Sequence, residues 1–243
     1  MNFEIRRFES IDSTNRYVLG EARRGAAAGL VAVADHQTAG RGRRGRSWSA
    51  PPGSSLLVSV LLRPMVPATR VHLLTMAAGV ALCEAVEATA GFAPVLKWPN
   101  DVMVEGRKLA GLLAESELGA NGAATAVVVG AGVNVDWPSL PPELADTATA
   151  CNLVAGRPVD RDALLDAFLN CLGARVAALA NVVPDYRGRL STLGRRVRVE
   201  TTSGTLTGTA LDVGGAGELI VEDDEGTRTS VHAGDVVHLR DAP

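Results

Sequence analysis

The residues best suited to chemistry are concentrated in one basic, glycine-rich stretch, DHQTAGRGRRGRSW, at residues 35–48. Glycines alternate there with four arginines, Arg41, Arg43, Arg44 and Arg46. Guanidinium groups repel one another, so this clustering favours a site that holds an anion, and the planar arginine fork suits carboxylate and phosphate. Glycine permits positive φ and lets backbone N–H groups approach a ligand. This stretch alone leaves a solvated basic loop or an RNA-contacting segment open as alternatives.

Lysine is scarce in this chain, and its two copies lie close together. Of 24 basic residues, only Lys97 and Lys108 are lysine, and the others are arginine. Lysine is a compact point charge on a flexible stem, which a fixed arginine fork cannot always replace. The pair therefore indicates a place where arginine would not serve, although a surface cation at a turn is the simpler interpretation of Lys108.

Composition restricts the class of protein. The 243 residues, 47% hydrophobic and 21% charged, are typical of one large domain and one small domain. A net charge of −3 argues against nucleic-acid binding by bulk charge. The three cysteines form no CxxC pair and the histidines have no ligand spacing, which favours a reduced cytoplasmic interior without a protein-built metal site. We expect neither a signal peptide nor a membrane span.

Apolar spacing and turn residues predict an alternation of strands and helices. We expect a helix capped within Asp12–Asn15 and a long buried helix over 69–90. A further helix should begin at the cap Asp160, with a shorter helix or turn at 184–193. The expected strands are 3–8, 30–34, 55–63, an extended segment at 94–98, a hairpin over 102–117 turning at Glu105-Gly106, and 127–135.

The pattern changes after Gly194. Short β-rich runs are separated there by SG, GGAG and DEG turns, which is typical of a small barrel-like β domain. We therefore predict a larger domain over 1–190 and a β domain over 191–243.

Five short stretches place glycine and polar residues at predicted strand ends or loops, where sites are commonly built. They are Asp12–Asn15, the arginine stretch, KWPND at 97–101, KLAG at 108–111 and GAGVN at 130–134. In this order and spacing they resemble the bacterial biotin–protein ligases, also called biotin–[acetyl-CoA-carboxylase] ligases or holocarboxylase synthetases. The GRGRRGR, KWPND and KLAG motifs are jointly very specific, and the resemblance runs from about Ile11 to the C-terminus.

The resemblance implies an α+β fold: a mixed β-sheet with packed helices, of the class II synthetase type, and a C-terminal SH3-like β-barrel. It also implies a reaction in which biotin and ATP with Mg²⁺ give biotinyl-5′-AMP and pyrophosphate. A lysine on the biotin carboxyl carrier domain of a carboxylase would then take the biotinyl group. The enzyme would be cytoplasmic.

The resemblance also implies residue roles. The biotin site would consist of Ser13, Thr14, Gln37, Gly40, Arg41, Lys108, Gly111, Leu113, Gly130 and Gly132. ATP and the adenylate would contact Arg43, Arg46, Trp48, Asn100, Lys108 and Asn134. Lys108, Arg43 and Asp101 would be catalytic, with Lys108 bridging the biotin carboxylate and the α-phosphate and Asp101 serving magnesium.

Two alternatives accompany this interpretation. A lipoate–protein ligase shares the fold and the reaction type, although the GRGRRGR and KWPND forms point to biotin. A nucleic-acid-binding protein could use the arginine stretch, but the acidic run Glu222–Glu225 would repel phosphate. Many members of the family carry an N-terminal DNA-binding domain, whereas here Asp12–Asn15 lies almost at Met1. We therefore expect no specific DNA binding and no repressor function, and a monomer or weak dimer.

Overall fold

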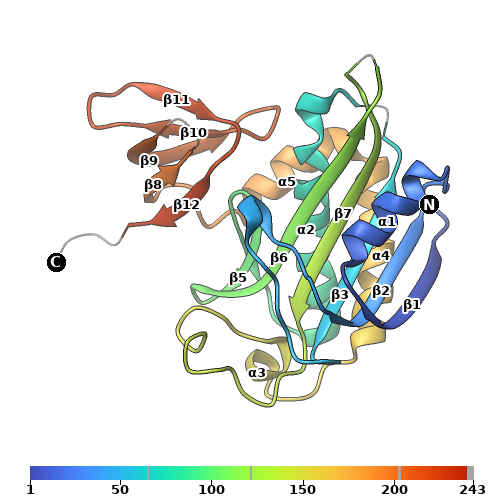
Figure 1. Cartoon of the computed structure of the whole chain (residues 1–243). Helices are drawn as coiled ribbons and strands as arrows, with labels where there is room; N and C mark the ends of the chain where they lie inside the picture. Colours follow the sequence, from blue (N-terminus) through green and yellow to red (C-terminus); the bar gives the residue numbers. More distant parts are fainter. Residues whose placement is uncertain (65, 121, 202–203, 240–243) are drawn as a thin grey trace.

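A seven-stranded mixed sheet forms the centre of the larger part of the molecule, with the order β1-β2-β3-β7-β6-β5-β4 (Figure 1). Strands β1 and β2 are parallel, and each other neighbouring pair is antiparallel. The computed structural model describes residues 1–64, 66–120, 122–201 and 204–239. The strands are β1 (Glu4–Ile11), β2 (Leu30–Gln37), β3 (Ser55–Leu62), β4 (Val95–Lys97), β5 (Asp101–Val104), β6 (Arg107–Leu118) and β7 (Ala124–Asn134).

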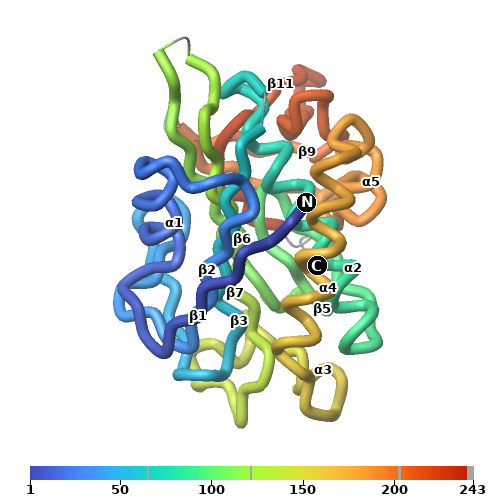
Figure 2. The backbone as a smooth tube through the Cα atoms, turned by 90° about the vertical axis from the view of Figure 1, so that its right-hand side faces the viewer, coloured from blue at the N-terminus to red at the C-terminus, as the bar shows by residue number. Residues whose placement is uncertain are grey.

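Helices cover both faces of this sheet, as Figure 2 shows. Helix α1 (Thr14–Arg23) lies on one face, and α2 (His72–Ala90), α4 (Arg161–Ala177) and α5 (Val182–Arg189) lie on the other. Because both faces are covered, the central strand β3 is buried along its whole length and consists almost entirely of apolar residues. The short helix α3 (Cys151–Ala155) follows the loop after β7.

Helix α2 is the core helix of the domain, and most of its residues are buried. By length and mean hydropathy alone, the stretch Ala68–Ala90 could cross a membrane. However, 72% of its most apolar window is buried within the structure. Its apolarity is therefore explained by packing against the sheet and against α4.

The C-terminal part forms a separate five-stranded antiparallel sheet with the order β11-β10-β9-β8-β12. Its strands are β8 (Arg196–Glu200), β9 (Thr205–Val213), β10 (Leu219–Glu222), β11 (Arg228–Val231) and β12 (Asp235–His238). Alternate residues such as Val197 and Val199 point into a small core, as period-2 patterning requires. This arrangement confirms the expected fold class, a mixed sheet with packed helices and an SH3-like β domain. The boundary at 190/191 stays a prediction.

Most predicted elements are present. The hairpin of β5 and β6 turns at Glu105 and Gly106, which both adopt positive φ, as a tight two-residue turn requires. Ser13 caps α1 and Asp160 caps α4, each through its side-chain oxygen. Helix α3 was not predicted from the sequence: it has no side-chain cap at its start, and it is followed by the C-cap Gly156 in the left-handed conformation.

Candidate active site

The predicted residues converge on a cavity of about 120 Å³ between the arginine loop and the sheet. We define the arginine loop as residues 40–48. Thirteen of the predicted site residues line this cavity: Ser13, Thr14, Gln37, Arg41, Arg43, Arg46, Trp48, Asn100, Lys108, Gly111, Leu113, Gly130 and Gly132. The sheet supplies its floor through the glycines of β6 and β7, and α1 supplies its first residues at one side.

Three predicted residues do not line the cavity. Gly40 lies behind it, where its carbonyl accepts a hydrogen bond from the Trp48 backbone N–H at 3.0 Å and closes the loop. Asp101 does not line the cavity itself but forms an ion pair with Lys108, which does. Asn134, at the end of β7, is buried, and its amide donates to the Thr149 carbonyl at 2.9 Å. In this arrangement Asn134 ties the sheet to the loop before α3.

A chain of polar contacts fixes one wall of the cavity. Thr14 donates to Gln37 Oε1 from both its backbone N–H, at 2.8 Å, and its hydroxyl, at 3.0 Å. The Ser59 hydroxyl lies 2.8 Å from the Thr14 hydroxyl and 2.6 Å from Asn15 Oδ1. Asn15 Nδ2 in turn donates to Glu115 Oε2 at 2.9 Å. Because these groups are largely buried, their mutual hydrogen bonds replace those that water would have made.

The same wall extends to the arginine loop. Glu115 Oε1 forms an ion pair with Arg41 Nη1 at 2.8 Å. The order of contacts is therefore Gln37, Thr14, Ser59, Asn15, Glu115 and Arg41. Such a wall offers amide, hydroxyl and guanidinium groups whose positions are already set, as a binding site for a polar ring requires.

No individual site role was predicted from the sequence for Asn15, Ser59 and Glu115, although Asn15 belongs to the predicted stretch Asp12–Asn15. A signal was present for two of them. Ser59 is a buried polar residue in the otherwise apolar interior of β3, and such a residue needs a partner. Glu115 is the first charged residue in β6 after the apolar run that follows Lys108. Asn15 lay within the predicted cap run, but Ser13 makes the cap, which frees the Asn15 side chain for the site.

Two glycines of β7 have a steric reason for their identity. A Cβ at Gly132 would lie 2.6 Å from the indole ring of Trp48, and a Cβ at Gly130 would collide with Asn15 Oδ1. The backbone of β7 therefore comes into direct contact with Trp48 from the arginine loop and Asn15 from α1. The indole N–H of Trp48 is buried and has no hydrogen-bond partner among the residues that the structure describes.

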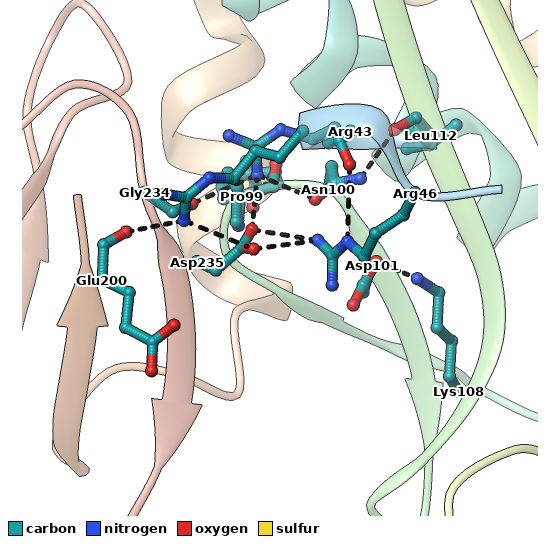
Figure 3. Close-up of polar contacts among 12 residues, drawn as sticks. Arg43, Arg46, Pro99, Asn100, Asp101, Lys108, Leu112, Glu200, Gly234 and Asp235 are labelled. Atoms are coloured by element: carbon teal, nitrogen blue, oxygen red, sulfur yellow. Dashed lines mark hydrogen bonds and ion pairs between the residues drawn. The ribbon is translucent and has the colours of Figure 1, made fainter. Parts of the chain in front are cut away.

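Three cations of the cavity lining, Arg43, Arg46 and Lys108, lie near Asn100 and Asp101 (Figure 3). Lys108 Nζ lies 2.6 Å from Asp101 Oδ1 and 5.8 Å from the centre of the Trp48 ring. Arg43 Nη1 donates to Asn100 Oδ1 at 3.2 Å. Burial lowers the pKa of the Arg43 guanidinium, and the nearby Asp235 carboxylate opposes that effect. Arginine nevertheless stays charged, because its ordinary pKa is far above neutral pH.

Lys97 lies beside this group on β4, opposite Asp101 in the strand pairing. Burial lowers the pKa of Lys97, and the Asp101 carboxylate opposes that effect. The ion pair of Asp101 is nevertheless made with Lys108. Asn100 Nδ2 donates to the Leu112 carbonyl at 2.7 Å, so the turn that carries Asn100 and Asp101 is tied to β6. Within the described part of the chain, no group of three or more His, Cys, Asp or Glu side chains could hold a metal ion.

Comparison with known proteins agrees with this fold. The model of the Biotin/lipoate A/B protein ligase family matches residues 7–134, more than half of the chain. The model of the Biotin protein ligase C terminal domain matches residues 192–239. The chain therefore belongs to the biotin/lipoate A/B protein ligase family and, within it, to the biotin protein ligases.

Individual relatives give the same assignment. The chain is 41% identical to the biotin–[acetyl-CoA-carboxylase] ligase of Mycobacterium tuberculosis, over 94% of this chain and 86% of the relative. It is 32% identical to the bifunctional ligase/repressor BirA of Bacillus spizizenii, over 93% of this chain and 71% of the relative. A solved structure of the Aquifex aeolicus biotin protein ligase, in complex with biotin and ATP, superposes with a TM-score of 0.84. It is 26% identical, with 98% of this chain and 99% of that chain covered.

Proposed function

We propose that this enzyme activates biotin with ATP to give biotinyl-5′-AMP and pyrophosphate, and then transfers the biotinyl group to a lysine of a biotin carboxyl carrier domain. The observation that carries the proposal is the make-up of one cavity. It joins a hydrogen-bonding wall, from Gln37 to Arg41, to a cationic group, Arg43, Arg46 and Lys108. Biotin has a polar ureido ring and a carboxylate, so it offers one group to each part of the cavity.

The first step brings two anions together. A carboxylate oxygen of biotin attacks the α-phosphorus of ATP, a P–O bond forms, and the bond to the leaving pyrophosphate breaks. Little covalent chemistry is required of the protein, so positioning and electrostatic stabilisation account for catalysis. In our proposal Lys108 bridges the carboxylate and the α-phosphate, while Arg43 and Arg46 neutralise the carboxylate and phosphate oxygens. Asn100 and Asn134 serve the nucleotide.

The arginine loop protects the product of this step. A mixed anhydride hydrolyses in water, so the site must exclude water until the acceptor arrives. Trp48 lies against Gly132 and Gly111 and covers the sheet at this point, which supports a role beside the adenylate. The backbone bond from Trp48 to Gly40 closes the loop at its base.

Magnesium fits this site in one specific way. Mg²⁺ prefers oxygen ligands and commonly uses one or two carboxylates together with substrate phosphates. Asp101 supplies such a carboxylate next to Lys108. We propose that Asp101 holds the Mg²⁺ that accompanies ATP, where the ion would add positive charge to the phosphates. The other ligands would come from ATP and water.

The second step transfers the biotinyl group. The amine of the acceptor lysine attacks the carbonyl carbon of the adenylate, an amide bond forms, and AMP leaves as the mixed anhydride breaks. The amine loses a proton in the process. We propose an acyl-CoA or pyruvate carboxylase as the source of the carrier domain, and a cytoplasmic site of action.

The test is biotin-dependent exchange of pyrophosphate into ATP by the purified protein. We expect exchange with biotin and none without it, and the absence of exchange would refute the proposed activation step. Lipoate in place of biotin distinguishes the lipoate–protein ligase alternative, for which exchange would depend on lipoate. A gel-shift assay with operator DNA tests the further expectation that the chain has no repressor function.

A further inference from the structure

Three arginines of the arginine loop lie within ion-pair distance of a single carboxylate that belongs to the C-terminal β domain, and Figure 3 labels two of them, Arg43 and Arg46. Asp235, the first residue of β12, lies 3.0 Å from Arg46 Nη2, 3.5 Å from Arg43 Nη1 and 3.6 Å from Arg44 Nη1. The backbone next to it also takes part, because the Gly234 carbonyl accepts from Arg43 Nη1 at 3.2 Å. The loop that faces the cavity is therefore held from the neighbouring domain.

Asp235 is the counter-ion of these three arginines. Among the residues that the structure describes, it is the only carboxylate within ion-pair distance of Arg43, Arg44 or Arg46. Arg41, by contrast, has its own partner in Glu115. Guanidinium groups this close together repel one another, and a shared carboxylate offsets that repulsion while no phosphate is bound.

The backbone of the loop needs this support as well. Arg44 adopts the left-handed conformation, with φ of 55° and ψ of 38°, which is unfavourable for a residue with a side chain. Its guanidinium donates to the Glu200 carbonyl at 3.1 Å, at the end of β8. The unfavourable residue of the loop is thus fixed by two neighbouring strands of the C-terminal domain, β8 and β12.

The contacts to the C-terminal domain leave hydrogen-bond donors free for a ligand. All contacts of the Arg43 guanidinium, to Asn100, Gly234 and Asp235, use Nη1. Its Nε and Nη2 have no hydrogen-bond partner within the described ranges. One edge of the guanidinium fork is therefore anchored while the other stays available, and anchoring of this kind positions a side chain without competing for its ligand.

We infer that Asp235 is a positioning residue: it holds Arg43, Arg44 and Arg46 in the phosphate-binding arrangement before the nucleotide arrives. The inference rests on the proposed function of the arginine loop. It makes the C-terminal domain part of the nucleotide site through one carboxylate that does not itself contact the reacting atoms.

The first test compares two isosteric substitutions in the C-terminal domain, Asp235→Asn and Asp212→Asn. Asp212 is the matched control, because it also pairs across the domains, with Arg187 at 2.6 Å, but does not contact the loop. We expect Asp235→Asn to raise the KM for ATP about tenfold, the effect of losing one charge-assisted hydrogen bond. The KM for biotin of Asp235→Asn should stay within about twofold of the wild-type value, the range of an ordinary surface substitution. Asp235→Glu, which keeps the charge, should bring the KM for ATP most of the way back to the wild-type value.

Two results would overturn the inference while exchange by the wild-type enzyme upholds the proposed function. One is a KM for ATP in Asp235→Asn that equals the wild-type value or falls below it. An equal value would mean that Asp235 does not position the arginines, and a lower value would mean that it competes with phosphate for them. The other is an equal rise in Asp212→Asn, which would assign the effect to domain docking. Thermal melting checks that each variant folds, and Asp235→Ser takes the place of the asparagine variant if that one does not.

The second test needs no enzymatic activity. Trypsin cleaves after arginine, and a loop that has lost its anchor is cut more readily. In the ligand-free protein, we expect Asp235→Asn to be cleaved within residues 41–46 faster than the wild type, and Asp212→Asn to be cleaved at the wild-type rate, as followed by mass spectrometry. Equal cleavage rates in all three proteins would show that Asp235 does not hold the loop.

Discussion

Lys108 on β6 and Asp101 on β5 form an ion pair between the two strands of the hairpin, with Nζ and Oδ1 2.6 Å apart, although the strand register places Asp101 opposite Gly111. Both side chains are partly exposed, at 33% and 25%, so the pair adds little to folding, on the order of 0–1 kcal/mol. This ion pair is short and lies at the edge of the cavity, yet it contributes little to stability. Its position is therefore better explained by a role in binding a ligand. Asp101 then keeps the lysine directed toward the site until the substrates compete for it.

The first prediction concerns Lys108. Lys108→Ala should lower biotin-dependent pyrophosphate exchange about 100-fold, since it removes a positioned charge at the reacting groups. Lys108→Arg should not restore activity, because a planar fork cannot replace a point charge between two anions. Arg107→Ala is the matched control, as it removes the neighbouring cation on the same strand, which pairs with Glu105 at the turn. Equal exchange rates in Lys108→Ala and Arg107→Ala would contradict the assigned role.

The second prediction concerns Glu115, which links Asn15 to Arg41. Glu115→Gln should raise the KM for biotin about tenfold, because Arg41 loses the charge that holds it at the cavity. The KM for ATP should change much less. Glu117→Gln is the control two residues further along β6, where the carboxylate pairs with Arg23 at the surface. A loss of ATP affinity in place of biotin affinity would show that the wall serves the nucleotide.

The sequence was sufficient to predict those parts of the site whose residues lie close together along the chain. The KLAG and GAGVN runs indicated strands, and their glycines line the cavity, while their contact with biotin stays a prediction. Asp235 could not be found in this way. Its role depends on where β12 of the second domain lies relative to the arginine loop, and 189 positions separate it from Arg46. The sequence marks Ser59 as a polar residue within an apolar strand, but its partners depend on β3 placing it beside α1.

The third prediction uses the glycines of β7. Gly132→Ala should displace Trp48, because the new Cβ would lie 2.6 Å from the indole ring. Such overpacking costs about 1–3 kcal/mol. We expect a lower melting temperature and increased hydrolysis of biotinyl-AMP, measured as release of AMP without acceptor. Gly188→Ala is the control, since nothing lies within 4 Å of its Cβ, and alanine within α5 should be neutral or stabilising. If Gly132→Ala had the melting temperature and the rate of AMP release of the wild type, Trp48 would have no role in protecting the adenylate.

The fourth prediction concerns pH and His238 on β12. Burial, followed by the charges of Lys97 and Arg195, lowers the pKa of His238 to about 4 from an ordinary value of 6.5. The unfolded chain therefore takes up a proton at higher pH than the folded protein does, so the free energy of unfolding should fall as the pH falls from 6.5 toward 4.

A substitution isolates this contribution. The His238 ring lies 3.2 Å from the Thr192 hydroxyl, a contact that a glutamine side chain can also make. His238→Gln cannot be protonated, so its free energy of unfolding should fall less over the same pH interval, as measured by urea unfolding across that range. His232→Gln, at an exposed histidine, controls for the loss of any histidine. Parallel pH profiles for wild type and His238→Gln would mean that the half-buried His238 ring is not held neutral at this junction, where β12 also carries Asp235 to the arginine loop.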